Sequence, residues 1–440
     1  MKKYSYLEAI SFFEELPHFA PPINTGVPLK DMFSLDAEQA LLEKLGNPHN
    51  DLKYVHVAGT NGKGSTVAYI SSVLDKAGIK VGTFASPFLF RYNEMFVVNG
   101  KEISDDEFAK IFSEVKPAYD ELASKGIYPS EYEILTVMGF VYFKEMKCDL
   151  VVLEVSMGGR VDTTNVIPAP IVTVITPISY DHMSILGNTL AEIAAEKAGI
   201  IKAGTVVVSA SQEKEVSTVL EEAAARIGVD LIYGQKPKVL SRSLKGQVFE
   251  LDEKYETSLL GTYQVDNAAL AILAVKQLRK RGYAISDAAI AEGIRGTKWF
   301  GRFSLTGENP YVIVDGGHNR QGAEVLRQSL EQYFPNQKIV FLMGILKDKE
   351  VDIILEKLMP IAKRCYVEEV PNKRTMTQKE LVDKIRQYGI DAVALEKGAN
   401  IKDLVRKDEV LCICGSLYLI EKYYSYNNFS HLNGTINKNR

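Results

Sequence analysis

Short apolar runs alternate with longer segments of helical periodicity through the first half of the chain, and this alternation restricts the fold more than any other feature. The runs lie at residues 54–58, 81–85, 150–155, 171–176 and 206–210. Several are rich in β-branched side chains and almost wholly apolar, as strands buried on both faces of a parallel sheet are. Helical segments between them include 65–77, 132–146 and 189–198. The alternation predicts an α/β domain with a mainly parallel sheet.

A second series of apolar runs indicates a second α/β domain. Its strand candidates are 311–314, 339–343, 365–370 and 410–414. A polar, irregular stretch at 234–260 and a helical pattern at 264–281 precede it, and Thr297-Lys-Trp-Phe-Gly-Arg302 is interpreted as the connection. We predict a first domain over residues 1–297, a smaller Rossmann-like domain over 298–425, and a disordered tail rich in Asn, Ser and Gly over 426–440.

The charge balance of the chain argues against a general nucleic-acid partner. Its 440 residues carry 52 Lys and Arg against 56 Asp and Glu, whereas binding to a phosphate backbone needs a basic excess. No run of about 18 apolar residues occurs, so no membrane-spanning helix is expected. Acidic residues interrupt the N-terminus, unlike a secretory signal, and the four cysteines form no C-x-x-C pair. We therefore expect a cytoplasmic monomer with no membrane or nucleic-acid partner.

A glycine-rich turn between an apolar run and a helical segment predicts a phosphate-binding loop. It comprises Gly59, Thr60, Asn61, Gly62, Lys63, Gly64, Ser65 and Thr66. Glycines let backbone N–H groups approach phosphate oxygens, and a helix N-terminus adds a favourable dipole. Lys63 would meet the β- and γ-phosphates of a nucleotide, and Ser65 or Thr66 could reach a magnesium ion. The alternative, a glycine-rich turn with a solvated lysine, fits the strand–turn–helix context less well.

Charged side chains gather where neighbouring strands are expected to end. Glu154 closes an apolar run, where a carboxylate is costly to bury unless it is paired or binds a metal. Asp181 and His182 follow the next run and should share the sheet edge with Glu154, because ligands of open α/β sheets collect there. Glu154 could instead cap a loop, and a lone histidine is often structural. On periodicity alone, Lys197 would be a surface lysine on an amphipathic helix.

Several ordered blocks resemble one ligase family. The stretch from Ala58 to Ser65 resembles the phosphate loop of the ATP-dependent Mur ligase superfamily, and the block Gly-Gly-Arg-Val-Asp-Thr-Thr-Asn ending at Asn165 resembles its folylpolyglutamate synthase / dihydrofolate synthase branch. Further matching blocks are Asp181-His182, Leu186-Gly187, Glu196-Lys197-Ala198-Gly199, Asp315-Gly-Gly-His318-Asn319 and Gly415-Ser-Leu-Tyr418. The resemblance spans residues 45 to 420. It implies a P-loop ATP-binding domain facing a C-terminal Rossmann-like domain.

The resemblance implies an acid–amino-acid ligase. ATP would phosphorylate a carboxylate of a reduced folate or of dihydropteroate, and the amino group of L-glutamate would attack the acyl phosphate. The lysine that matches Lys197 is carbamylated in the family, and a carbamate carries negative charge where an ammonium group would repel magnesium. Glu154, His182 and carbamylated Lys197 would then hold Mg²⁺ near the γ-phosphate, and Ser65 would hold the ATP-bound ion. Metals clamp two anions that otherwise repel each other.

Other matches imply positions around the nucleotide. Gln264 and Asn267 resemble the adenine-side contact, although side chains there could equally cap a helix. Arg302 resembles the linker arginine that reaches the ATP phosphates, a task suited to its planar fork of donors. Asp315 and His318 resemble catalytic residues that meet the nucleotide from the second domain.

The substrate side is less regular than the ATP side. The matching residues are Ser86, Pro87, Phe88, Arg91, Asp162 and Asn165. Aromatic side chains there could stack on a pterin ring, although packing alone would also explain Phe88. The family usually has His in place of Phe88, an Arg-Leu-Glu-like ending where this chain has Arg302-Phe-Ser304, and an Arg-Ile-like segment that is not clear within residues 31–39. These departures leave the choice of folate open.

Two other functions compete with a folate–glutamate ligase. One is a Mur-type amino-acid ligase that acts on another carboxylate, such as a cell-wall nucleotide precursor. The early position of the phosphate loop leaves little room for an extra N-terminal domain and weighs against it. The other is a nucleotide-binding module without ligase chemistry, which would not need a lysine placed for carbamylation or a second domain carrying Asp315 and His318.

Overall fold

The computed structural model describes residues 2–16, 34–396 and 398–424. These residues fall into two compact units that interleave along the chain. The first unit draws on Met1–Phe88, Tyr92–Lys236 and Asp266–Ile294, and the second on Leu89–Arg91, Pro237–Val265 and Arg295–Arg440. The predicted domain boundary after residue 297 stays a prediction, and the predicted disordered tail lies outside the described residues.

The first unit is built on an eight-stranded sheet in the order β4-β3-β2-β5-β1-β6-β7-β8. Its strands are β1 (Tyr54–Ala58), β2 (Val81–Phe84), β3 (Phe96–Val98), β4 (Lys101–Glu102), β5 (Leu150–Glu154), β6 (Val172–Ile175), β7 (Val206–Ser209) and β8 (Leu231–Tyr233). In this spatial order, every pair of neighbours from β2 through β5, β1, β6 and β7 to β8 is parallel. At the other edge, β3 pairs antiparallel with both β2 and β4. The five strands predicted from apolar runs are confirmed, because their side chains are buried on both faces.

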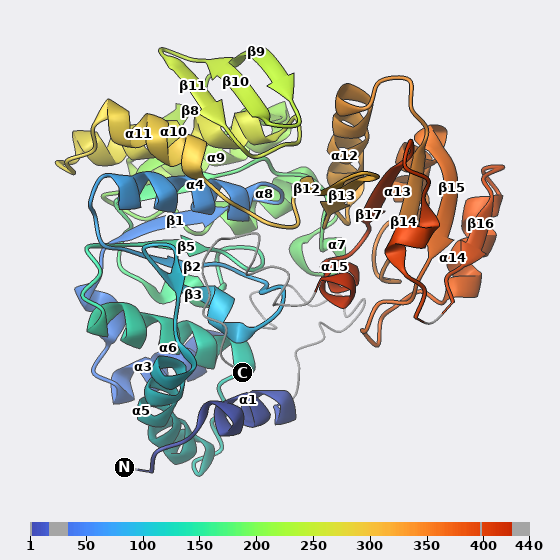
Figure 1. Ribbon diagram of the computed structural model, residues 1–440. Helices are drawn as coiled ribbons and strands as arrows, with labels where there is room; N and C mark the ends of the chain where they lie inside the picture. Colours follow the sequence, from blue (N-terminus) through green and yellow to red (C-terminus); the bar gives the residue numbers. More distant parts are fainter. Residues whose placement is uncertain (1, 17–33, 397, 425–440) are drawn as a thin grey trace. The chain divides into compact units, whose positions relative to one another are not determined.

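Helices cover both faces of this sheet (Figure 1). The helices that lie in this unit for all or most of their length are α1 (Tyr6–Glu15), α3 (Asp36–Lys44), α4 (Lys63–Lys76), α5 (Asp105–Ala123), α6 (Glu131–Glu145), α7 (Met183–Leu186), α8 (Leu190–Ala198), α9 (Lys214–Ile227), α10 (Gln264–Lys280) and α11 (Asp287–Gly296). Helix α4 packs against β1, β2 and β5, while α3, α5 and α6 gather on the opposite side. Four of these helices, α1, α5, α6 and α8, start with a Ser or Thr N-cap and a Glu at the third position, so both side chains satisfy otherwise unpaired N–H groups.

The second unit carries a six-stranded sheet in the order β12-β13-β17-β14-β15-β16. Its strands are β12 (Ser304–Glu308), β13 (Tyr311–Asp315), β14 (Ile339–Met343), β15 (Ala362–Val367), β16 (Ala392–Ala394) and β17 (Val410–Cys414), and its helices are α12 (Arg320–Tyr333), α13 (Val351–Leu358), α14 (Gln378–Arg386) and α15 (Leu417–Tyr423). All pairs are parallel except β12 with β13. This Rossmann-like sheet confirms the fold class that the sequence predicts.

The sequence interpretation of residues 234–260 is wrong. The stretch 234–260, expected to be irregular, contains an antiparallel sheet of β9 (Lys238–Ser243), β10 (Gly246–Glu250) and β11 (Lys254–Thr257). Its strands bury alternate side chains, Gln247 and Phe249 on β10 and Tyr255 and Thr257 on β11, so their composition stays polar overall. Buried Gln247 is satisfied because its amide donates to the Leu259 and Gly261 carbonyls, each at 2.9 Å.

Candidate functional site

The phosphate loop connects β1 to the N-terminus of α4, as predicted. Its backbone is anchored by the segment after β6, because the N–H groups of Thr60 and Asn61 donate to the Pro177 carbonyl at 2.9 and 3.3 Å. The Thr60 hydroxyl donates to the Ser179 carbonyl at 3.0 Å. Lys63 folds back over the loop and donates to the Thr60 carbonyl at 3.1 Å. The loop is therefore held in shape before a phosphate arrives.

Two glycines of the loop are required by close contacts. A Cβ at Gly59 would lie 1.8 Å from Oγ1 of Thr176, and one at Gly62 would lie 2.4 Å from Oδ1 of Asn267. Both glycines have positive φ angles, which L side chains rarely adopt. The second contact locates Asn267, a predicted adenine-side residue, directly against the phosphate loop.

Lys197 lies on the phosphate loop and not on the surface, so the interpretation from helical periodicity alone is wrong. Its ammonium group, on α8, donates to the Gly59 carbonyl at 2.8 Å, and the side chain is 4% exposed. Burial, together with the positive charge of Lys63, lowers the pKa of Lys197 to about 7. Because burial penalises the charged form, a substantial share of Lys197 is neutral amine near neutral pH.

Glu154 lies at the end of β5 and His182 in the segment that follows β6, and these two strands flank β1, so both residues are on the sheet edge that the sequence predicts. Glu154 closes β5 beside Val57 of β1 and is 5% exposed. His182 follows β6, has a positive φ of 50° and precedes α7. Its ring Nε2 lies 3.9 Å from Oδ1 of Asp181, whose carboxylate also accepts the His182 backbone N–H at 2.9 Å. The expected sheet edge is thus formed by the phosphate loop, Glu154 and the segment 177–182.

The donor set at this edge suits Mg²⁺ better than a softer metal. Among the described residues, no three His, Cys, Asp or Glu side chains converge on one point. Mg²⁺ seldom needs such a cage, since it keeps water ligands and binds one or two carboxylates together with substrate phosphates. Ser65 and Thr66 add hydroxyls at the start of α4, and within the described residues the buried Oγ1 of Thr66 has no hydrogen-bond partner. These residues fit an ATP-bound magnesium ion.

Two predicted substrate residues, Asp162 and Asn165, lie in the loop that follows β5 (residues 156–165). Oδ2 of Asp162 accepts the N–H groups of Ser156 and Met157, each at 2.9 Å. Burial raises the pKa of the Asp162 carboxyl, and these hydrogen bonds oppose the rise. The Asn165 amide donates to the Arg160 and Gly199 carbonyls at 3.0 and 3.2 Å. Both side chains therefore hold this loop, and their contact with substrate stays a prediction.

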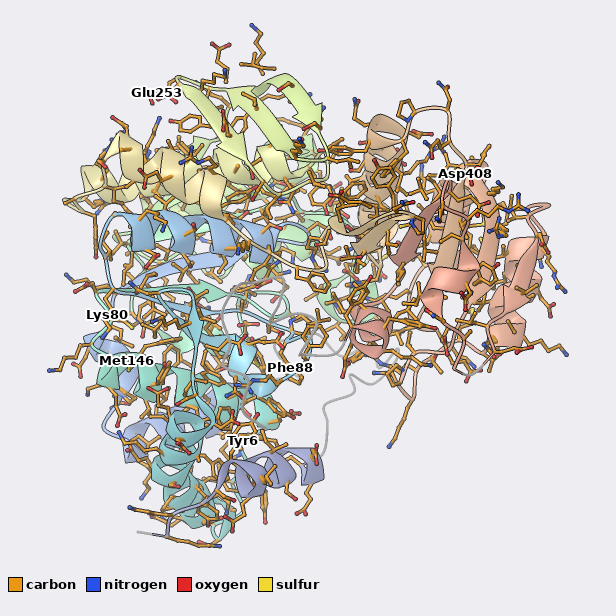
Figure 2. The ribbon with its side chains drawn as sticks, viewed as in Figure 1. Tyr6, Lys80, Phe88, Met146, Glu253 and Asp408 are labelled. Carbon is orange, nitrogen blue, oxygen red and sulfur yellow. The ribbon has the colours of Figure 1, made fainter. Side chains whose placement is uncertain are left out.

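The predicted substrate segment 86–91 is divided between the units. The Ser86 hydroxyl lies 3.0 Å from that of Tyr132, a partly buried residue of α6. Phe88, labelled in Figure 2, packs against Tyr92 with ring centroids 4.6 Å apart. Arg91 belongs to the second unit. Phe88 thus has an aromatic neighbour of its own, which supports packing as part of its role.

The second unit gathers the remaining predicted residues around Asp315 at the end of β13. Its Oδ2 accepts the Tyr263 hydroxyl at 2.9 Å and the Phe303 N–H at 2.8 Å, while Oδ1 accepts the Gly317 N–H at 2.7 Å. Burial raises the pKa of Asp315, and the positive charge of Arg302 opposes this. His318 donates from Nδ1 to the Gly316 carbonyl at 2.9 Å. Arg302, Asp315 and His318 therefore form one cluster.

Gln264 begins α10 and is fully buried, with its backbone N–H donating to the Gly261 carbonyl at 3.1 Å. Its neighbour Tyr263 is a residue that sequence reasoning missed, although its place beside the predicted Gln264 was a hint. His56 was missed as well, and its position inside the apolar run of β1 was the available sign. The side chains of Tyr263 and His56 each form a hydrogen bond with a predicted residue or with a neighbour of one.

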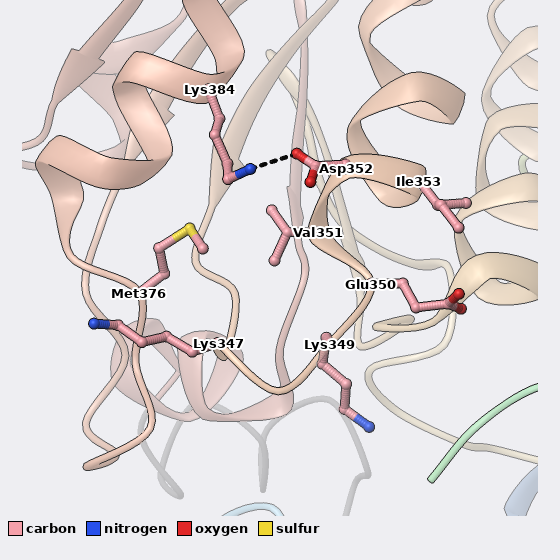
Figure 3. A pocket seen from close by; sticks show the side chains of 8 residues that line it. All are labelled: Lys347, Lys349, Glu350, Val351, Asp352, Ile353, Met376 and Lys384. Carbon is pink, nitrogen blue, oxygen red and sulfur yellow. Dashed lines mark hydrogen bonds and ion pairs between the residues drawn. The ribbon is translucent and has the colours of Figure 1, made fainter. Parts of the chain in front are cut away.

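A hollow elsewhere in the second unit does not resemble an anion site. It has a volume of about 360 Å³ and is lined by Lys347, Lys349, Glu350, Val351, Asp352, Ile353, Met376 and Lys384 (Figure 3). Lys384 pairs with Asp352 at 2.6 Å and Lys347 with Glu380 at 3.3 Å. Acidic neighbours thus offset the positive charge of its lining.

Across the described residues, no helix is long and apolar enough to cross a membrane.

Comparisons with known proteins agree with this architecture. Residues 57–275 match the Mur ligase middle domain, and residues 301–417 match the Mur ligase glutamate ligase domain. The chain is 39% identical to the dihydrofolate synthase/folylpolyglutamate synthase of Bacillus subtilis over 405 residues, covering 86% of this chain and 91% of the relative. It is 31% identical to the folylpolyglutamate synthase of Lacticaseibacillus casei, covering 94% and 97%.

Solved structures give the same result. The folylpolyglutamate synthase of Thermotoga maritima has a TM-score of 0.81 at 31% identity and covers 98% of both chains. That of Mycobacterium tuberculosis, complexed with ADP and AMPPCP, has a TM-score of 0.83 at 27% identity and covers 98% of this chain and 99% of its own. Fold and site define an ATP-dependent ligase of the Mur type. Within that class, the chain belongs to the folylpolyglutamate synthase / dihydrofolate synthase family.

Proposed function

We propose that this ligase joins L-glutamate to a tetrahydrofolate, extending a polyglutamate tail, and that it also accepts dihydropteroate. The γ-phosphate of ATP passes to a substrate carboxylate, and the glutamate amino group then displaces phosphate to form the amide. The relatives whose names include both activities, among them that of Bacillus subtilis, support the second substrate. A solved complex of a related synthase with AMPPCP and folate supports the first.

The observation that carries the proposal is the position of Lys197. Its amine lies 2.8 Å from the Gly59 carbonyl, inside the phosphate loop, where an ammonium ion would compete with a metal for the same phosphate oxygens. With its pKa lowered to about 7, Lys197 supplies the neutral amine that carbamylation needs. The nitrogen attacks CO₂, a C–N bond forms and one proton is released. A carbamylated Lys197 would be an anionic ligand in place of a cation.

The other predicted residues take distinct roles in this proposal. Ser65, Glu154, His182 and Lys197 would hold Mg²⁺, which when bound would offset the charge between phosphate and carboxylate. Lys63 and the phosphate-loop N–H groups bind the phosphates, and Asn267 lies against that loop. In the second unit, Arg302, which lies beside Asp315, would reach the ATP phosphates, and Asp315 and His318 would meet the nucleotide. Excluding water from the acyl phosphate favours amide formation over hydrolysis.

The test measures phosphate release with ATP, magnesium and L-glutamate. Parallel samples contain tetrahydrofolate, dihydropteroate or neither, and mass spectrometry identifies the products. We expect one phosphate per added glutamate with both acceptors. Product from tetrahydrofolate alone would remove dihydropteroate from the proposal and make Phe88 the first residue to exchange for His. ATP binding without glutamate transfer to either acceptor would contradict the proposed function.

A variant series tests the role of Lys197. Lys197→Ala should lose turnover and regain part of it with short-chain carboxylic acids, which replace the missing anion. The exposed Lys214, at the start of α9, provides the matched control Lys214→Ala, which should retain turnover. Carbon-13 bicarbonate should give a carbamate resonance that Lys197→Ala lacks. Full turnover in Lys197→Ala would overturn the role proposed for Lys197.

We further propose that the protein is a cytoplasmic monomer. Light scattering of the purified protein tests whether it is monomeric.

A further inference from the structure

A chain of buried hydrogen bonds connects β1 to the 156–165 loop. The hydroxyl of Thr164 donates to Oδ1 of Asp162 at 2.5 Å, and the Thr164 backbone N–H reaches the same oxygen at 3.0 Å. On its other side, Oγ1 of Thr164 lies 2.8 Å from Nε2 of His56. His56 and Thr164 are fully buried, and Asp162 is 6% exposed.

The direction of these hydrogen bonds determines the tautomer of the His56 ring. A hydroxyl has one proton, and Thr164 gives it to Asp162, so Oγ1 must accept from His56. Nε2 therefore carries the hydrogen and Nδ1 is bare. Burial lowers the pKa of His56 to about 3, helped by the charge of Lys202, so the ring stays neutral. His56 acts as a fixed neutral donor throughout the physiological pH range.

At its other end, this series of hydrogen bonds reaches the segment that follows β5. Asp162 accepts two hydrogen bonds on each oxygen, and those on Oδ2 come from Ser156 and Met157, directly after Glu154. The same loop is docked on α8, because the Arg160 N–H donates to the Glu196 carbonyl at 2.8 Å. A Cβ at Gly159 would lie 3.1 Å from Cα of Lys197, so the two backbones are in close contact.

We propose that His56 and Thr164 are positioning residues, which lock Asp162 so that the 156–165 loop holds Glu154 and Lys197 in register with the phosphate loop. His56 lies on β1, the strand that leads into the phosphate loop, three residues before Gly59. In this arrangement Asp162 acts on the reaction through the backbone, since its acceptor sites are occupied by the chain itself. The inference deepens the proposed function, because the residues that it positions are those to which that function assigns chemistry.

Hydroxyl and ring are removed separately to test the proposal. Thr164→Val deletes the donor at almost unchanged volume, whereas Thr164→Ser keeps it. His56→Leu deletes the ring donor, whereas His56→Gln retains a neutral N–H. Thr173→Val is the matched control, because it removes a buried hydroxyl of the same sheet that pairs with Thr205 at 3.0 Å. Each variant is first checked for an unchanged circular dichroism spectrum.

Hydrogen exchange reports the positioning role without requiring turnover. Loss of a hydrogen bond to a charged group is worth about tenfold or more in a local opening equilibrium. We expect exchange at Ser156 and Met157 to accelerate by that factor in Thr164→Val, and by about twofold to tenfold in His56→Leu, which loses a bond between neutral groups. Exchange should stay near wild type in Thr164→Ser, His56→Gln and Thr173→Val. Equal exchange in Thr164→Val and wild type, or equal acceleration in Thr164→Ser, would overturn the proposal.

Kinetics separate positioning from substrate binding. Misplaced catalytic groups lower kcat about tenfold to a hundredfold, and we expect the KM for ATP to change by less than about twofold because the phosphate loop is untouched. His56→Leu and Thr164→Val combined should lose no more than the worse single variant, since both break one chain. A loss confined to the KM for folate would contradict the proposal and restore Asp162 as a direct substrate contact.

Nitrogen-15 labelling of histidine provides an independent readout. His56 should show a protonated Nε2 and a bare Nδ1 without titration in the range where ordinary histidines titrate. A titrating His56, or a protonated Nδ1, would refute the assigned hydrogen-bond direction. If the wild-type protein transfers glutamate to no folate, the proposed function fails, while the exchange and labelling experiments still decide the positioning role.

Discussion

Burial of Lys197 should cost the protein stability that a neutral side chain recovers. The pKa of Lys197 falls from 10.5 to about 7 on folding. At pH 7 this shift corresponds to about 4 kcal/mol of lost stability, from 1.36 kcal/mol per unit and half-protonation in the folded state. Lys197→Met removes that cost but also the hydrogen bond to Gly59, worth about 1 kcal/mol. We expect the variant to be about 3 kcal/mol more stable at pH 7 while it loses ligase activity.

The stability advantage of Lys197→Met should change with pH in a defined direction. Between pH 7 and 10.5 the unfolded chain binds more protons at this lysine than the folded chain does. Wild-type stability therefore rises with pH through that window, and the advantage of Lys197→Met shrinks until it vanishes at about pH 10. Below pH 7 the advantage is constant, because both states are protonated there.

Thermal unfolding in nucleotide-free buffer purged of CO₂ measures both effects. For a unit of this size, about 3 kcal/mol raises the midpoint by roughly 6–12 °C. The exposed Lys214→Met should leave the midpoint unchanged at every pH. An advantage of Lys197→Met that is absent at pH 7, or equal at pH 7 and 10, would refute the burial of a destabilised amine.

Three further perturbations follow from single contacts. Gly59→Ala places a methyl group 1.8 Å from Oγ1 of Thr176, so calorimetry should show ATP affinity reduced by about a hundredfold or more. Gly204→Ala brings the same strain of a positive φ, but its Cβ meets nothing within 4 Å, so this control should bind ATP normally. Tyr263→Phe deprives Asp315 of a donor and should cost about 1–3 kcal/mol in denaturant unfolding. Thr189→Ala removes the N-cap of α8 and should cost about 1 kcal/mol, seen as a lower melting midpoint.

The parallel sheets could be predicted from sequence because their strands are buried on both faces. Runs such as 150–155 then contain almost only apolar residues, and composition alone marks them. The antiparallel sheet β9–β11 carries no such mark. One of its faces is polar, and its core includes the polar residues Gln247 and Thr257. The burial of Gln247 depends on hydrogen bonds to carbonyls 12 and 14 positions away.

The site was predictable where strand ends supply it and less so where helices do. Glu154 and the phosphate loop follow strands, and the topology of a parallel sheet brings strand ends together. Lys197 lies on a helix whose sequence pattern places it on the polar side, and it is buried because α8 packs against the 156–165 loop and the amine reaches the phosphate loop. The resemblance to a family supplied what periodicity could not. The hydrogen-bonding role of His56 depends on Thr164, over a hundred residues away, and no local pattern indicates such a pair.

Asp162 and Asp315 show how one type of residue serves both units. Each carboxylate is buried beside a strand end and accepts backbone N–H groups from two separate positions, which are 156–157 and 164 of one loop for Asp162, and Phe303 and Gly317 for Asp315. An anion that gathers N–H groups in this way fixes loops that lack regular hydrogen bonding, and burial makes those bonds stronger while it makes a missing partner costly. The loops that bear catalytic groups can then remain irregular without being loose. Hydrogen-bonded aspartates of this kind therefore fix the loop after β5 in the first unit and the loop after β13 in the second.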